Sequence, residues 1–200
     1  DEVQDVYKAW RKIFNQYKPA RMAVGEAWVD AKRRTAYATK EELGQAFNFD
    51  LLKAKFDAAE FKEIISRNLA EAKEAGSSST WVLSNHDVIR HPSRYGLDQY
   101  EDEDGNIGNK WLLKGGAPSD VDVERGNRRA DAAIMFLLGL PGSTYMYQGE
   151  ELGLHEVGDI ADEHRQDPTF FNSPGVEIGR DGCRVPLPWT GEQAEGFGFG

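Results

Sequence analysis

Apolar residues recur every three or four positions in three stretches of the chain, and this spacing predicts three amphipathic helices. The first is expected to end before Pro19, with Trp10 and Phe14 facing a core. Gly76 is expected to close the second, because glycine is common just after a helix end. The three helices are predicted over residues 2–17, 56–75 and 121–138.

Four short apolar runs predict strands over residues 21–25, 43–49, 80–83 and 143–147. Continuous apolar runs are typical of strands that are buried on both faces. Because these strands alternate with helices, the sequence predicts parallel βαβ units and the α/β fold class. Four such strands could form half of an eight-stranded barrel or a small doubly wound sheet. No Gly-rich phosphate loop follows a strand, and no helix follows the last one, so we favour the half barrel.

The polar and glycine-rich stretches predict the connections. Residues 30–40 are expected to form a loop with a short helix, and residues 96–120 a long loop. The chain after Gly149 has no regular periodicity. Most of the regular structure is therefore expected before that glycine.

Two predicted strands lead directly into carboxylates. The run 81–83 is followed by His86 and Asp87, and the run 22–24 is followed by Glu26. Active sites of α/β barrels lie where such strands end. Two carboxylates there suit glycoside hydrolysis, in which one acid protonates the leaving oxygen and other carboxylates attack or stabilise the transition state. Glu26 and Asp87 are therefore candidate catalytic residues.

The neighbours of these residues predict different protonation states. Glu26 lies between an apolar run and Trp28, and we expect this environment to keep its carboxyl group protonated. Asp87 is flanked by His86 and close in sequence to Arg90, which should hold it ionised. The alternative is that either carboxylate caps a helix or forms a surface ion pair.

The amino-acid composition argues against nucleic-acid binding and against a membrane span. With 24 basic and 34 acidic residues, the formal net charge is −10, which argues against nucleic-acid binding. No run of about 18 apolar residues occurs, so we expect no membrane span. Cys183 is the only cysteine, which excludes an internal disulfide and is compatible with a reducing, cytoplasmic location.

The sequence suggests no metal and no cofactor. The acidic segment 102–106 lacks the later glutamate of a calcium loop, and the four histidines do not share metal-ligand spacing. Glu150 and Glu151 could suggest a metal site or a second acid, but we interpret the segment 148–151 as one that shapes the rim of the pocket. Cys183 has no paired base nearby in sequence, so we do not expect it to be a nucleophile.

Four segments carry most of the motif-like residues: Val24-Gly-Glu-Ala-Trp28, Ser84-Asn-His-Asp87 with Arg90, Gly142–Gly153 and Gly179–Trp189. The first three resemble successive motifs of the α-amylase/α-glucosidase family of glycoside hydrolases. The fourth is similar to a segment found in the α-glucosidase branch. Since the segments appear in family order, the resemblance implies the C-terminal half of a (β/α)8 TIM barrel, with strands five to eight, truncated at both ends.

The resemblance also implies roles for single residues. Glu26 matches the general acid/base at the end of the fifth strand, and Asp87 matches the transition-state-stabilising aspartate at the end of the seventh. His86 matches a histidine that hydrogen-bonds sugar hydroxyls, and Arg184 resembles an arginine that helps close the same subsite. The implied reaction is hydrolysis, with retention, of a terminal α-glucosidic bond in a small oligosaccharide or disaccharide.

The chain departs from the family pattern at the nucleophile. In the family this aspartate belongs to a Gly-Phe-Arg-x-Asp motif at the end of the fourth strand, and no such motif occurs in these 200 residues. We therefore expect a partial catalytic barrel domain over residues 1–200, without the family's inserted domain and C-terminal β domain, and inactive by itself. The sequence does not predict the oligomeric state.

Two other functions fit the same residues. A transglucosylase or isomerase of the family would share them, because hydrolysis and transfer use the same groups. The alternative from another class is a non-catalytic carbohydrate-binding or partner subunit with this fold. The presence of Glu26, His86 and Asp87 counts against that alternative.

Overall fold

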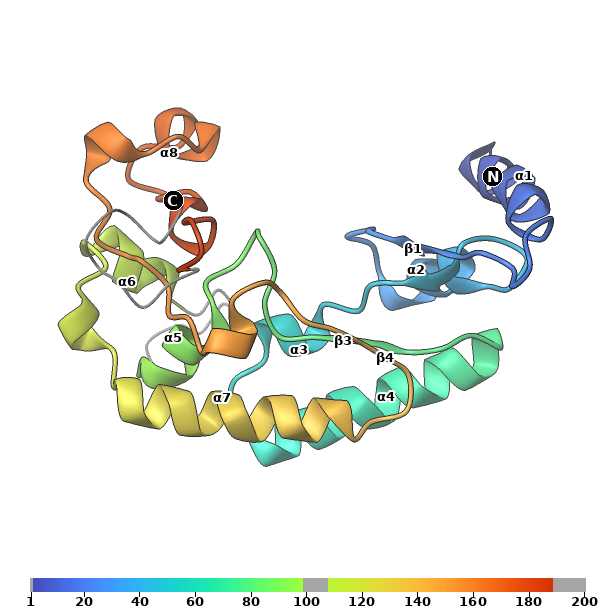
Figure 1. Cartoon of the computed structure of the whole chain (residues 1–200), viewed down its shortest axis with the longest axis horizontal. Coiled ribbons are helices and arrows are strands. Elements are labelled where there is room, and N and C mark those ends of the chain that lie inside the picture. Colours follow the sequence, from blue (N-terminus) through green and yellow to red (C-terminus); the bar gives the residue numbers. More distant parts are fainter. Residues whose placement is uncertain (1, 99–107, 189–200) are drawn as a thin grey trace. The chain divides into compact units, whose positions relative to one another are not determined.

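Short parallel strands form at all four apolar runs (Figure 1). In the computed structural model, which describes residues 2–98 and 108–188, β1 (Ala23–Gly25) pairs with β2 (Gly44–Ala46). β3 (Thr80–Val82) pairs with β4 (Ser143–Tyr145). Both pairs are parallel, so the prediction of parallel α/β structure is confirmed for each pair. Each strand has three residues and is shorter than predicted.

Side chains connect the two strand pairs. The hydroxyl group of Thr80 donates a hydrogen bond to the carbonyl oxygen of Ala46 at 2.9 Å, which joins β3 to β2. The side-chain amide of Gln45 donates to Ser143 Oγ at 2.6 Å, and the Tyr145 hydroxyl donates to Gln45 Oε1 at 2.8 Å. These bonds hold β2 close to both strands of the other pair.

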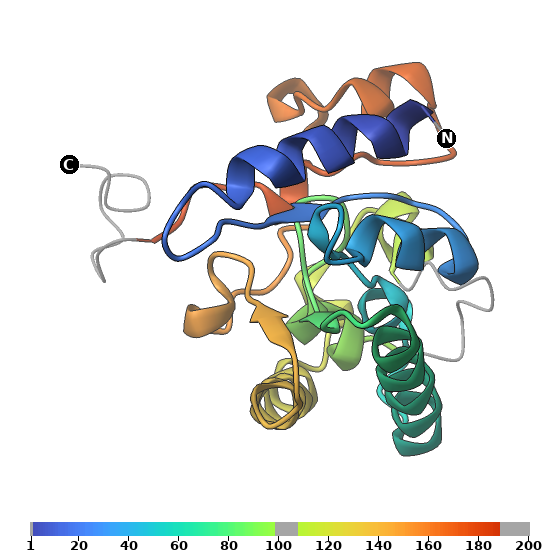
Figure 2. The same cartoon turned by 90° about the vertical axis from the view of Figure 1, so that its right-hand side faces the viewer.

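The long helix α4 (Ala58–Ala75) lies between β2 and β3 in the sequence and has 18 residues. It is the long dark-green helix of Figure 2. Asp57 caps its first turn, because its carboxylate accepts hydrogen bonds from the main-chain nitrogens of Ala59 and Glu60. Gly76 ends the helix in the left-handed conformation, with φ of 61°. The helix buries Phe61, Ile64, Ile65 and Asn68.

The first helix, α1 (Glu2–Phe14), is held by polar contacts. Arg11 donates to the main-chain oxygens of residues 42–43 at 2.7 and 2.6 Å. Trp10 is 46% exposed and Phe14 only half-buried, so the prediction that both face a core is wrong for Trp10. No residue of α1 is buried, and its apolar residues Val3, Val6 and Ile13 are exposed as well.

The connections contain more helix than the sequence predicts. The expected short helix in residues 30–40 is present as α2. The stretch 96–120 was expected to be a loop throughout, but its described part contains α6 and η1, whereas residues 99–107 lie outside the described residues. Helices of one or two turns are too short to produce a periodic signal. The short helices are α2 (Ala31–Ala38), α3 (Asp50–Lys53), α5 (His91–Gly96), α6 (Asn109–Leu113), η1 (Pro118–Asp120), η2 (Glu150–Leu152), η3 (Asp162–His164), α8 (Pro168–Asn172) and η4 (Asp181–Cys183).

The described residues form two units, and each is considered by itself. The first comprises residues 2–82 and 136–145, and the second comprises residues 83–98, 108–135 and 146–188. Helix α7 (Val123–Leu138) begins in the second unit and ends in the first. None of the described helices is both long enough and apolar enough to cross a lipid bilayer. An apolar core in the second unit comprises Ile89, Leu97, Trp111, Leu112 and Val121.

Candidate active site

The chain turns immediately after β3, and the turn determines how Asp87 is presented. The main-chain nitrogen of Asp87 donates to Asn85 Oδ1 at 2.9 Å, which forms an Asx turn. Buried Ser84 accepts a hydrogen bond from the main-chain nitrogen of His91 at 2.9 Å. As a result, His86 is exposed and Asp87 is half-buried at the tip of the turn.

Arg90 anchors this turn to other parts of the second unit. It is 1% exposed and donates to the carbonyl oxygens of Gln148 and Cys183 at 2.9 and 3.0 Å. Its own main-chain nitrogen donates to Glu156 Oε2 at 2.9 Å. The guanidinium group of Arg90 is therefore engaged elsewhere, and the expectation that it pairs with Asp87 is wrong.

Two other arginines form ion pairs with Asp87. Arg180 Nη1 lies 2.8 Å from Asp87 Oδ1, and Arg184 Nη2 lies 3.0 Å from the same oxygen. The other oxygen, Oδ2, lies 3.6 Å from His86 Nε2. Arg184 also donates from Nε to the carbonyl oxygen of His86 at 2.7 Å. The structure thus brings together three of the predicted site residues, His86, Asp87 and Arg184.

Arg180 was not among the predicted site residues. Its Nε lies 2.6 Å from Asp167 Oδ2, so the same guanidinium group binds two carboxylates. The hydrogen bonds from Arg180 hold the pKa of Asp167 well below its usual range, and Asp167 in turn raises the pKa of Arg180. The signal available in the sequence was the position of Arg180 in the same motif as Arg184. The signal for Asp167 was absent, since it lies in a stretch without periodicity.

Glu26 lies at the end of β1 in the first unit, where the sequence placed it. Its side chain is exposed, so the apolar enclosure that we expected is wrong for the described residues. Trp28 stacks on Phe49 with ring centroids 4.3 Å apart, and the Lys53 amine lies 4.7 Å from the Trp28 ring centroid. The indole therefore packs on Phe49 and Lys53.

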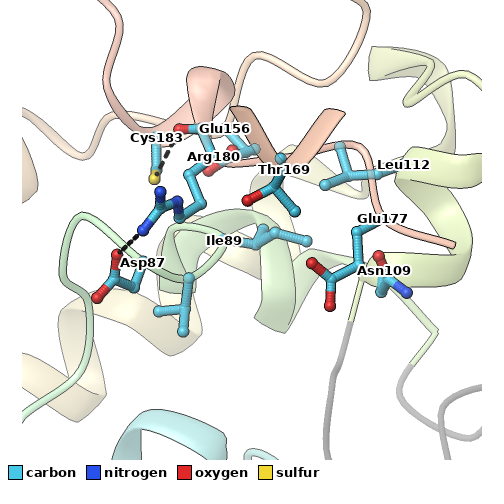
Figure 3. Close-up of a pocket in the computed structure, with 11 residues that line it drawn as sticks. Asp87, Ile89, Asn109, Leu112, Glu156, Thr169, Glu177, Arg180 and Cys183 are labelled. Atoms are coloured by element: carbon cyan, nitrogen blue, oxygen red, sulfur yellow. Dashed lines mark hydrogen bonds and ion pairs between the residues drawn. The ribbon is translucent and has the colours of Figure 1, made fainter. Parts of the chain in front are cut away.

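A cavity of about 280 Å³ opens beside Asp87 in the second unit (Figure 3). The guanidinium group of Arg180 points toward Asp87 at one end, and Glu177 and Asn109 lie at the other. Glu156 and Cys183 also line the cavity. Its volume is close to the lower end of the range of roughly 300–1,000 Å³ that is typical of ligand pockets. The cavity is thus of a size to hold one small polar molecule.

Two of the residues that line this cavity are buried ionisable groups. Burial raises the pKa of Glu156 to about 7 and that of Cys183 to about 12. Cys183 is therefore a protonated thiol at neutral pH, which supports the interpretation that it is not a nucleophile. The Glu150 side chain is 1% exposed, so the prediction that it shapes the rim of a pocket is wrong.

Comparison with known proteins assigns the chain to a family. The model of the α-amylase catalytic domain matches residues 1–200. The chain belongs to the α-amylase family. Maltase 1 of Drosophila virilis is 28% identical over 215 residues, which cover the whole chain and 29% of the maltase. A probable α-glucosidase of Rhizobium meliloti is 30% identical, over 95% of the chain and 30% of that protein.

Solved structures agree with this assignment. A crystallised α-glucosyl transfer enzyme, XgtA, is 29% identical with a TM-score of 0.71, covering 98% of the chain and 32% of XgtA. Trehalose-6-phosphate hydrolase of Bacillus licheniformis is 25% identical with a TM-score of 0.67, covering 99% of the chain and 37% of the hydrolase. These neighbours are TIM-barrel enzymes of the α-amylase family. The chain spans about 30% of the length of the curated relatives that it matches.

Proposed function

We propose that this chain contributes the acid/base and the stabilising aspartate to an α-glucosidase-like, retaining glycoside hydrolase. The substrate would be a terminal α-glucosidic bond in a small oligosaccharide or disaccharide. One observation carries the proposal: His86, Asp87 and Arg184 form a cluster in a chain of the α-amylase family. The maltase and α-glucosidase relatives support the same activity.

The proposal includes a position for the strands. We assign β1 to β4 to strands five to eight of the family's barrel. The parallel pairing within both strand pairs and the family order of the motifs support this assignment. It places the residues that follow β1 and β3 at strand ends, where barrel enzymes carry their catalytic groups.

In this mechanism, Asp87 stabilises the positive charge that develops on the glucosyl ring. Its Oδ1 is held by two guanidinium groups, whereas Oδ2, among the described residues of the second unit, has an ion-pair contact with His86 Nε2 at 3.6 Å and none with an arginine. Oδ2 is thus the oxygen that faces the sugar. His86 and Arg184 would donate hydrogen bonds to sugar hydroxyls, and both have nitrogen atoms near Asp87 with which to do so.

Glu26 would protonate the leaving oxygen and then activate the water that releases the product. Its exposed position after β1 leaves the carboxyl group accessible to a substrate. A retaining mechanism also needs a nucleophilic carboxylate, and the family's motif for it does not occur in these 200 residues. The proposal therefore concerns the enzyme that contains this chain together with such a nucleophile.

Transfer of the glucosyl group to another sugar is the second candidate function. XgtA, whose name describes α-glucosyl transfer, is 29% identical to this chain. Hydrolysis and transfer share the same catalytic groups and differ in whether water or a sugar hydroxyl accepts the glucosyl unit. Product analysis with maltose at high concentration separates them: glucose alone indicates hydrolysis, and longer or rearranged oligosaccharides indicate transfer.

The general-acid role of Glu26 predicts a large effect of Glu26→Gln. The protein expressed from its complete coding sequence should cleave p-nitrophenyl α-glucoside, with the α-anomer of glucose as first product by NMR. Glu26→Gln should lower kcat/KM for maltose by about 10²–10⁴-fold, because the amide cannot donate a proton to the leaving oxygen.

The matched control is Glu41→Gln, which changes an exposed glutamate of the same unit and should leave activity within about twofold, as for most surface substitutions. A loss of less than about tenfold for Glu26→Gln would show that Glu26 is not the general acid. No cleavage by the wild-type protein would favour the non-catalytic binding alternative.

A further inference from the structure

Arg180 binds two carboxylates, those of Asp87 and Asp167, with one guanidinium group. Its Nη1 binds Asp87 Oδ1, while Nε and Nη2 bind the two oxygens of Asp167 at 2.6 and 3.2 Å. The contact with Asp167 consists of two hydrogen bonds, a two-point fork that fixes the plane of the guanidinium group as well as its position. Arg180 therefore reaches Asp87 from a fixed direction.

Asp167 is itself held in place. Its side chain is 1% exposed. Oδ1 accepts a hydrogen bond from the main-chain nitrogen of Thr169 at 3.0 Å, and Oδ2 accepts one from that of Arg180 at 2.9 Å. Its own main-chain nitrogen donates to Asp181 Oδ1 at 3.1 Å. Rotation of Arg180 away from Asp167 would leave a buried carboxylate without its charge partner, which is strongly unfavourable.

The backbone near Arg180 favours this arrangement. Gly179 has φ of +85°, a conformation that other residues rarely adopt. A Cβ atom at Gly179 would lie 3.0 Å from Asp167 Cβ, so the absence of a side chain lets the main chain pass close to the aspartate. The glycine thus allows the Arg180 main-chain nitrogen and side chain to bind the same carboxylate.

Arg184 has a looser set of contacts. Its Nη2 binds Asp87 and its Nε binds the carbonyl oxygen of His86. Within the described residues, Arg184 forms no ion pair with a second carboxylate. Arg184 can therefore change partners at a lower cost than Arg180.

We propose that Arg180, locked by Asp167, is a positioning residue that sets the orientation of the Asp87 carboxylate. This inference rests on the proposed function, in which Asp87 stabilises the transition state. Oδ1 is held by Arg180, and this leaves Oδ2 directed at the substrate. Arg180 contacts Asp87 and acts on the reaction only through it.

The proposal predicts a separation between kcat and KM. The orientation of Asp87 matters most when positive charge develops on the ring, so a misplaced carboxylate should lower kcat and change KM little. We expect Arg180→Ala to lower kcat for p-nitrophenyl α-glucoside by about tenfold to a hundredfold, the size of effect that a small misplacement of a catalytic group produces. Arg184, as a sugar contact, should mainly change KM.

Three further variants test the mechanism. Arg180→Lys keeps the charge but cannot form the two-point fork, so it should be nearly as impaired as Arg180→Ala. Asp167→Asn should lower kcat in the same direction by a smaller factor. Arg125→Ala is the control, since Arg125 is 36% exposed, close to the 38% of Arg180, and forms an ion pair with Asp122 instead. Added guanidinium ion should restore part of the kcat of Arg180→Ala.

The outcomes are distinguishable. If Arg180→Lys keeps wild-type kcat, or if guanidinium ion does not restore Arg180→Ala, the positioning role is wrong. If Arg180→Ala does not fold, Arg180→Lys and Asp167→Asn decide in the same assay.

If the wild-type protein does not cleave glucosides, the proposed function fails, and the crystal structure of Arg180→Lys tests the inference separately. A reoriented Asp87 carboxylate would support positioning by Arg180, and an unchanged one would overturn it.

Discussion

At the scale of single residues, Glu150 illustrates what burial does to a carboxyl group. Its side chain is 1% exposed, and its Oε1 lies 3.8 Å from Nδ1 of His91. Burial raises the pKa of Glu150 to about 7. The His91 pKa is lowered to about 3, first by burial and then by Arg94 and Arg90. His91 is thus neutral near pH 7 and does not compensate a negative charge on Glu150.

This raised pKa predicts a pH-dependent effect of Glu150→Gln on stability. A carboxyl group with a higher pKa in the folded state contributes stability below its unfolded pKa, and this stability is lost as pH rises through about 7. Glu150→Gln should therefore raise the free energy of unfolding by about 1–3 kcal/mol at pH 8 and by much less at pH 5. The measurement is urea unfolding of variant and wild type at both pH values.

The lowered pKa of His91 has the opposite effect on stability, which falls as pH drops below 6.5. His91 is present in both proteins, so its contribution cancels in the difference between their free energies of unfolding. Exposed Glu163 provides the control, and Glu163→Gln should change stability little at either pH. An equal effect of Glu150→Gln at pH 5 and pH 8 would contradict the assignment of a raised pKa.

Only some residues of the candidate site could be predicted from the sequence. His86, Asp87 and Arg184 were predicted from motifs, and they lie together. The partners of Asp87 were predicted wrongly, because Arg90 is near Asp87 in the sequence but points its guanidinium group at main-chain oxygens. Arg180 is 93 residues from Asp87 along the chain, and no local pattern predicts a contact over that separation.

At the scale of elements, the N-terminal cap of α4 is formed by one side chain. Asp57 Oδ1 accepts hydrogen bonds from Ala59 and Glu60 at 3.0 and 2.9 Å. Asp57→Ala leaves these two donors without their side-chain acceptor and should lower the free energy of unfolding by about 0.5–2 kcal/mol. Asp57→Asn keeps an acceptor and should restore most of the loss. Thermal or urea unfolding measures both, and equal stability of the two variants would show that the cap does not act through its acceptor.

Elements with a long periodic pattern were predicted well. The two helices after the first strand were expected over 56–75 and 121–138 and are observed as α4 and α7, within two residues at each end. The strands were found at the right places but are shorter than predicted. The single-turn helices such as α5 and α6 were missed, since five or six residues do not complete two turns and leave no repeat to detect.

At the scale of the whole molecule, stability depends on contacts that join distant segments. In the first unit, Thr80 Oγ1 accepts a hydrogen bond from the main-chain nitrogen of Asn48 at 2.8 Å and donates one to Ala46. Thr80 is 1% exposed and Asn48 is 7% exposed, so neither partner has access to bulk water. One hydroxyl group therefore satisfies two main-chain groups of another segment.

Thr80→Val replaces that hydroxyl with a methyl group of similar size. It should lower the free energy of unfolding by about 1–3 kcal/mol, because a buried N–H and a buried carbonyl lose their partner. Thr80→Ser keeps the hydroxyl and loses one methyl group, which should cost about 0.8 kcal/mol. Urea unfolding of both variants tests this, and a Thr80→Val variant as stable as Thr80→Ser would show that the hydroxyl is not needed.

The sequence by itself determined the type and order of the main elements, the parallel pairing, and the motifs that belong to the α-amylase family. These properties depend on local spacing and residue type, which are visible along the chain. Only the tertiary structure decided that Arg180 and Arg184 pair with Asp87, that Glu150 is buried, and that Thr80 joins β3 to β2. The physical reason is that ion pairs, burial and hydrogen bonds form between groups that are neighbours in space, and separations such as 93 residues carry no local signal.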